Sequence, residues 1–283
     1  MKNRIINISV ACMWKACLFS GLLFLFACEE QKRVIEPFVP SGNRVVLLEE
    51  FTGKACTHCP KGSREIENLL TLFPNNLVAV SIHAGPFADP ASNPTYGPND
   101  LRAPQAQDLF TLLGPVLFYP TGSVNRVPVS GDMQLTLNQW ASAISAILDE
   151  EPAIELSIEN EYNDASRELQ VTVSGIGKYS VSGDLRLSVM LVESNIVDFQ
   201  SDIEAGGLVT DYVHKHVLRD MLTPANGTSI LSSIATGQTF SQSFTKTIPP
   251  EWNADNMEII AFVTNTQGTS FPVLQATSVH LAD

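Results

Sequence analysis

The chain is poor in cysteine, in basic side chains and in long apolar runs, and the last two shortages each exclude a class of protein. Lys and Arg number 17 against 30 Asp and Glu, and the formal net charge of −13 argues against nucleic-acid binding, because phosphates repel such a surface. No run is long and apolar enough to span a bilayer, which takes about 20 residues. The sequence contains no internal repeat, no low-complexity tract and no motif for an organic cofactor.

The N-terminus has the features of an export signal. Its first 15 residues contain three basic and no acidic side chains, and an uncharged apolar run follows up to Ala27. This pattern is typical of a signal peptide over residues 1–27. The run ends Leu-Phe-Ala-Cys, which resembles a bacterial lipobox and predicts lipid attachment at Cys28. Ordinary signal-peptidase cleavage, with an incidental Cys28, is the alternative.

Cleavage and lipidation would give an anchored protein with few thiols. The chain without its first 27 residues has 14 basic and 30 acidic side chains, a net charge of −16. Residues 28–43 are expected to be a tether, and the lipid on Cys28 would hold the protein to a membrane. We therefore expect an outer membrane lipoprotein of the bacterial cell envelope, facing the periplasm or the surface. Only Cys56 and Cys59 would remain as thiols, in a compartment where disulfides persist.

Residues 44–151 alternate strand and helix signals. Compact apolar runs typical of buried strands are followed by apolar residues at helical spacing. Strands are expected at 44–51, 77–83 and 119–127, and helices around 66–73, 106–113 and 137–148. The alternation predicts an α/β layer in which Cys56 follows the first strand and opens a helix. Open α/β sheets place their sites at that carboxyl end.

Residues 152–283 have a different period. Apolar and polar side chains alternate, and turn residues separate the segments. Strands are expected at 153–159, 168–175, 184–193, 239–248 and 257–264. Period 2 with one apolar face predicts an all-β, immunoglobulin-like sandwich of antiparallel strands. We place the boundary between the two domains at 151–152.

The C-x-x-C pair, Cys56 and Cys59, favours redox chemistry over a structural role. A disulfide stabilises mainly by restricting the unfolded chain, so one that closes such a small loop would contribute little. A helix N-terminus favours negative charge, and it should therefore lower the thiol pKa of Cys56. His58, when cationic, would stabilise the thiolate further. Cys56 is then expected to attack a substrate disulfide, and Cys59 to resolve the mixed disulfide.

Two glutamates precede the C-x-x-C. One of Glu49 and Glu50 could face the interior near Cys59 and accept a proton during exchange. A surface carboxylate with no chemical role is an equally good interpretation of either residue. Residues 89–100, rich in Pro, Asn and Gly, are by default a solvated insertion.

The order of strand, C-x-x-C, helix, strand, helix and X-Pro turn resembles the thioredoxin-like superfamily. The resemblance implies that Pro120 is the cis-proline that faces the active disulfide, and His58 is similar to the C-x-H-C of strongly oxidising members. A closer match covers nearly the whole chain after residue 27. The stretches LLEEFTGKACTHCP, SIHAG, YPTGSVNR and YVHKHVLRD resemble the 28-kilodalton-outer-membrane-protein-related lipoproteins. That resemblance implies an envelope location and a thioredoxin-like first domain, and no established activity.

Other functions compete with thiol–disulfide exchange on envelope proteins. In one, Cys56, Cys59 and His83 bind Cu(I) or Zn(II); a zinc ribbon is excluded because there is no second C-x-x-C. In another, the protein is a non-enzymatic surface or interaction lipoprotein with a vestigial C-x-x-C. His214 and His216 would share one face of a strand, as a metal pair or, more simply, as solvated side chains.

Overall fold

The structure is a computed structural model that describes residues 43–89 and 99–282. All of these belong to one compact unit, Pro37–Asp283. The predicted signal peptide, the lipidation site Cys28 and most of the tether lie outside the described residues.

The N-terminal half follows the predicted order of elements. The elements are β1 (Val46–Thr52), α2 (Cys59–Leu72), β2 (Leu77–His83), α3 (Ala106–Leu113), β3 (Thr121–Val124) and α4 (Leu137–Leu148). Strand β1 pairs with β2 in parallel and with β3 antiparallel. Pro60 lies in the first turn of α2, where a missing N–H costs no hydrogen bond. The first cysteine of the pair lies in the turn between β1 and α2, and the second begins α2.

The C-terminal half consists of strands and one short 3-10 helix, η3 (Ala254–Asn256). The strands are β4 (Ile154–Asn163), β5 (Glu168–Gly177), β6 (Val181–Glu193), β7 (Ile196–Asp202), β8 (Gly207–His214), β9 (Val217–Met221), β10 (Thr228–Ile234), β11 (Thr239–Thr247), β12 (Met257–Thr266) and β13 (Val273–His280). Five of them, β4, β5, β6, β11 and β12, match predicted segments. The other five carry no clear alternation of apolar and polar side chains.

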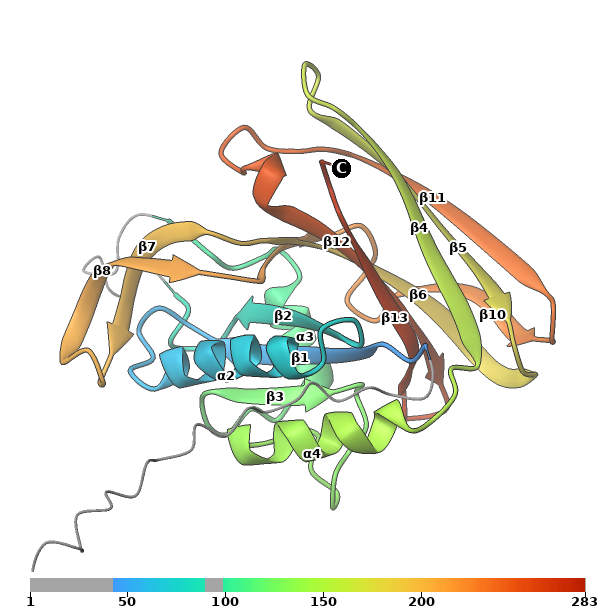
Figure 1. The fold of residues 1–283 in the computed structure, drawn as a ribbon, viewed down its shortest axis with the longest axis horizontal. Coiled ribbons are helices and arrows are strands. Elements are labelled where there is room, and N and C mark those ends of the chain that lie inside the picture. Colours follow the sequence, from blue (N-terminus) through green and yellow to red (C-terminus); the bar gives the residue numbers. More distant parts are fainter. Residues whose placement is uncertain (1–42, 90–98, 283) are drawn as a thin grey trace, which may run out of the picture. The chain divides into compact units, whose positions relative to one another are not determined.

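One eight-stranded sheet joins the two halves (Figure 1). Its order is β13-β12-β6-β9-β2-β1-β3, and β10 pairs with β6. The five residues of β9 make the junction, because β9 pairs in parallel with β2 at Ser81 and Val217 and antiparallel with β6. The predicted fold class, a thioredoxin-like α/β domain followed by an immunoglobulin-like sandwich, is wrong. The described residues form thirteen strands and three α-helices, a mostly β protein whose halves share a sheet.

The buried side chains of the two halves also pack together. One hydrophobic core mixes the two halves: it contains Leu47, Phe51, Val80 and Ile82 together with Met190, Val192, Leu218 and Phe262. A second core lies between α2, α4 and the β1–β2 strands, with Trp140 fully buried in it. The third lies between the large sheet and a three-stranded sheet of order β11-β5-β4. Local periodicity predicts the elements of the N-terminal half and five strands of the C-terminal half, but the partner of each strand depends on contacts far apart in sequence.

Candidate functional site

The two cysteines form a disulfide at the start of α2. Cys56 lies in the turn after β1, Cys59 is the first residue of the helix, and their Cα atoms are 5.4 Å apart. The side chains are almost covered, with 4% of Cys56 and 1% of Cys59 exposed. The intervening Thr57 and His58 are exposed. Only the dipeptide between the cysteines therefore faces solvent freely.

Pro120 packs on the same helix. The Tyr119–Pro120 peptide bond is cis, and Pro120 is buried. A Cβ atom added at Gly62 would lie 2.9 Å from the Cβ of Pro120. Since Gly62 follows Cys59 by three residues, both lie on one face of α2, and Pro120 approaches that face one turn beyond the disulfide.

Glu50 lies beneath the same turn of α2, with no exposed surface. Its Oε2 accepts a hydrogen bond of 3.0 Å from the Ser81 hydroxyl, and its Oε1 has no hydrogen-bond partner among the described residues. A Cβ added at Gly62 would lie 2.1 Å from that free Oε1. Burial raises the pKa of Glu50 to about 8, although the Ser81 bond acts in the opposite direction. The carboxyl group is thus mostly protonated at neutral pH, and it lies against Gly62, which is one helical turn after Cys59.

Glu49 points to the opposite face of β1 and has a different environment. Its two carboxylate oxygens accept hydrogen bonds of 2.8 and 2.7 Å from Nε and Nη2 of Arg126. Both side chains are buried. The interpretation of either glutamate as a surface carboxylate is therefore wrong, and only Glu50 lies on the side of α2 and the disulfide.

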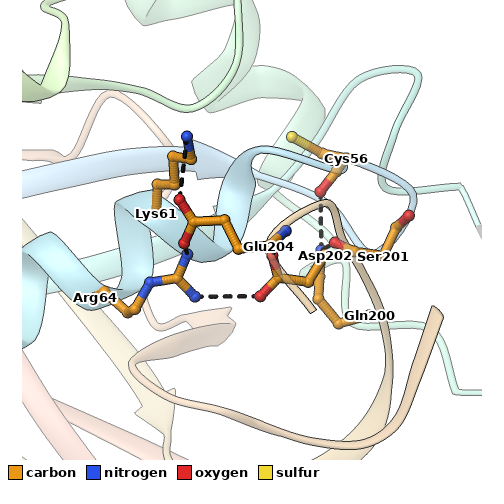
Figure 2. A network of polar contacts seen from close by, with 7 residues as sticks. All are labelled: Cys56, Lys61, Arg64, Gln200, Ser201, Asp202 and Glu204. Atoms are coloured by element: carbon orange, nitrogen blue, oxygen red, sulfur yellow. Dashed lines mark hydrogen bonds and ion pairs between the residues drawn. The ribbon is translucent and has the colours of Figure 1, made fainter. Parts of the chain in front are cut away.

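The β7–β8 hairpin covers the C-x-x-C turn (Figure 2). The backbone N–H groups of Ser201 and Ile203 donate to the carbonyl oxygens of Lys54 and Thr57, at 2.8 and 3.0 Å. The side-chain amide of Gln200 donates to the carbonyl oxygen of Cys56 at 3.0 Å. The cover therefore comes from the C-terminal half of the chain and is bonded to the backbone on both sides of Cys56.

Ion pairs fasten the hairpin tip to α2. Glu204 pairs with both Lys61 and Arg64, and Arg64 also pairs with Asp202 at 3.2 Å (Figure 2). The side chains of Lys61, Arg64 and Glu204 are about half exposed, so salt screens these pairs and each contributes little. The tip is held mainly by the backbone bonds.

A buried ion pair anchors the base of the hairpin. Nζ of Lys54 lies 3.1 Å from Oδ2 of Asp198 on β7, and both side chains are nearly inaccessible. Nζ also donates to the carbonyl oxygen of Asn99 at 2.6 Å. The sequence predictions missed Lys54, Asp198 and Gln200. The one available signal was charge, because acidic residues in 198–204 complement basic residues in 54–64.

Two of the candidate metal-binding histidines, His83 and His214, lie beside each other. His83 is buried, neither of its ring nitrogens has a hydrogen-bond partner in the described part of the chain, and its ring centroid lies 5.6 Å from that of His214. Burial first, and then the positive charges nearby, lower its pKa well below 6.5. His216, which was predicted to share a face with His214, instead approaches Glu67 at 3.0 Å. Within the described part of the chain, no cluster of three or more His, Cys, Asp or Glu side chains could hold a metal ion.

Comparison with known proteins decides the family. The model of the family described as outer membrane protein Omp28 matches residues 115–283. The chain belongs to the Omp28 family of outer membrane proteins. The predicted family and the predicted outer membrane location are thereby confirmed. The match begins after the C-x-x-C, so membership of the Omp28 family is independent of the candidate redox site.

Solved structures similar to this Omp28 family member support the fold. HBP35 of Porphyromonas gingivalis aligns with a TM-score of 0.67 and 18% identity, over 86% of this chain and 77% of its own. Protein AGR_C_4864 of Agrobacterium tumefaciens aligns with a TM-score of 0.52 and 11% identity, over 83% of this chain and 94% of its own. At such identities the likeness concerns the fold alone. No protein with a curated description matches the chain, and no helix of the described residues has the length and apolar character to span a membrane.

Glu50 and Pro120 approach α2 so closely at Gly62 that a side chain at this position would contact both of them. We expect Gly62→Ala to lower the free energy of unfolding by about 1–3 kcal/mol, because the methyl group would overlap Oε1 of Glu50 in a packed interior. In a Glu50→Ala background the same substitution should cost less. Urea denaturation of the four proteins of this double-mutant cycle gives the coupling energy. Equal costs in the two backgrounds would contradict the contact.

Proposed function

We propose that this Omp28 family member exchanges disulfides with thiols of envelope proteins through Cys56 and Cys59. The observation that carries the proposal is the disulfide at the first turn of α2 with the protonated, buried carboxyl of Glu50 on the same side of that helix. A group that holds a proton near neutral pH is suited to supply or remove protons during exchange. A lipid on Cys28 would keep this chemistry at the outer membrane.

The exchange is a balanced two-electron transfer. A substrate thiolate attacks Sγ of Cys56, the Cys56–Cys59 bond breaks, and Cys59 leaves as a thiolate that takes a proton from Glu50. A second thiolate of the substrate then attacks the substrate sulfur that is bonded to Cys56, and Cys56 leaves as a thiolate that takes a proton from solvent; Glu50 regains its proton from solvent as well. The substrate gains a disulfide and the protein becomes a dithiol; the reverse sequence reduces a substrate disulfide. Cationic His58 would stabilise the Cys56 thiolate, and Pro120 would flank the approaching substrate.

The reduction potential of the pair tests the proposal. The full-length protein is equilibrated with glutathione redox buffers, its thiols are alkylated, and tryptic peptide 55–61, which contains both cysteines, is quantified by mass spectrometry. We expect a potential between about −120 and −270 mV, the range of exchange proteins. Cys59→Ser should trap mixed disulfides with envelope proteins, and Cys56→Ser should abolish both trapping and exchange.

The low exposure of both cysteines favours one alternative, a surface interaction protein with an inert disulfide. A potential below about −300 mV would support it, since structural disulfides of exported proteins lie there. An empty trap in Cys59→Ser would do the same. Either result would overturn the redox proposal.

A further inference from the structure

The C-terminal half contributes directly to the turn that carries Cys56. Gln200, on β7, is 2% exposed. Its Nε2 donates to the carbonyl oxygens of Cys56 at 3.0 Å, Gly53 at 3.3 Å and its neighbour Ser201 at 2.9 Å. Two of these acceptors lie in the turn, so one amide group links Gly53, the residue after β1, to the candidate attacking cysteine.

The rest of the hairpin fixes the same turn at its two ends. The backbone of Ser201 bonds to Lys54, and that of Ile203 bonds to Thr57. Lys54 is also held through its side chain by Asp198. All of these partners contact the backbone or Lys54, and none of these hydrogen bonds and ion pairs involves a sulfur atom. They therefore remain available when the disulfide is reduced.

We propose that Gln200 is a positioning residue that holds the Cys56 turn in the same conformation in the oxidised and reduced protein. This inference deepens the proposed function and rests on it for its biological meaning. A turn that is already ordered in the dithiol loses less entropy when the disulfide forms, which raises the effective concentration of one thiol at the other. Gln200 thus favours the disulfide and accelerates attack by Cys59 on a mixed disulfide.

The test replaces Gln200 with methionine, which has a similar length and no donor. We expect the equilibrium constant for Cys56–Cys59 formation in redox buffers to fall about tenfold, a rise of about 30 mV in potential. Release of a mixed disulfide between Cys56 and glutathione should slow by a similar factor. Gln200→Asn, which keeps the amide on a shorter side chain, gives a second variant if Gln200→Met does not fold, and it should show the same direction of change.

Gln275→Met is the matched control. Gln275 is also buried. Its side-chain amide donates to the carbonyl oxygen of Asn43 and accepts a hydrogen bond from the backbone N–H of Val45, just before β1. This variant should lose stability and keep the wild-type potential. A Gln200 variant that folds and keeps the wild-type potential and release rate would overturn the inference. Because the equilibrium can be measured whether or not the protein acts on substrates, this failure differs from failure of the redox proposal, which shows in the wild-type potential and the trap.

Discussion

Replacing Arg126 with methionine should lower the free energy of unfolding by about 3–5 kcal/mol, the range for breaking one side of a buried ion pair. Arg126 makes the two-bond contact with Glu49, and its guanidinium lies 4.8 Å from the ring centroid of Phe262 on β12. The substitution leaves the Glu49 carboxylate buried without a partner. Urea denaturation followed by circular dichroism measures the change.

A double variant separates the loss of the partner from the loss of the arginine itself. Glu49→Leu combined with Arg126→Met removes both charges, and such apolar replacement of a buried pair is often neutral or stabilising. We expect the double variant to regain most of the stability lost in Arg126→Met. If the double variant is no more stable than the single one, the cost lies in the lost contact of Arg126 with the Phe262 ring and not in the unpaired charge of Glu49.

Replacing Glu50 with glutamine should stabilise the protein, and the gain should grow with pH. Burial raises the pKa of Glu50 to about 8 from an ordinary value of 4.5. Between these values the unfolded chain releases the proton while the folded protein keeps it, so the folded state binds more protons and stability falls as pH rises. At pH 7 the difference corresponds to a penalty on the order of 3 kcal/mol, which the uncharged amide removes in part.

The measurement is the unfolding free energy of wild type and Glu50→Gln from pH 4 to pH 8.5. Below about pH 4.5 both folded and unfolded Glu50 are protonated, so the two proteins should differ little there and most near pH 8. Glu161→Gln, the same change on an exposed position of β4, is the control and should give no such trend. A gain that is independent of pH would show that Glu50 titrates normally. In the redox proposal, Glu50→Gln also slows exchange, because Cys59 loses its proton donor.

The sequence is a good guide to the elements around the cysteines and a poor one to their surroundings. Apolar spacing locates β1, β2 and α2 because each depends on a few neighbouring residues. The same patterns cannot show that Val217 pairs beside Ser81, since β9 is only five residues long and its partners are distant in sequence. Each half has its own period, and period alone therefore predicts two separate folds where the structure has one shared sheet.

The surroundings of the site escaped prediction for a related reason. Nothing in residues 196–202 distinguishes Gln200 from a surface side chain until β7 is placed on the C-x-x-C turn. Glu49 and Glu50 are adjacent and chemically identical, yet the pleat of β1 sends one to Arg126 and the other beneath α2. The different surroundings of the two carboxyl groups arise from tertiary packing and not from local sequence.

Because β9 lies between β2 and β6 in the large sheet, the N-terminal strands cannot complete their sheet until a late part of the chain is present. As the chain emerges from its N-terminus, β1, α2 and β2 are present long before Val217–Met221 arrive, and until then β2 has an open edge of the kind that invites pairing with other chains. Contacts this far apart in sequence form slowly. The β7–β8 contacts to the Cys56 turn also depend on this later part of the chain, so we expect the cysteines of newly made molecules to be accessible to other thiols until it has folded. We expect the region up to residue 151, produced alone, to aggregate rather than fold.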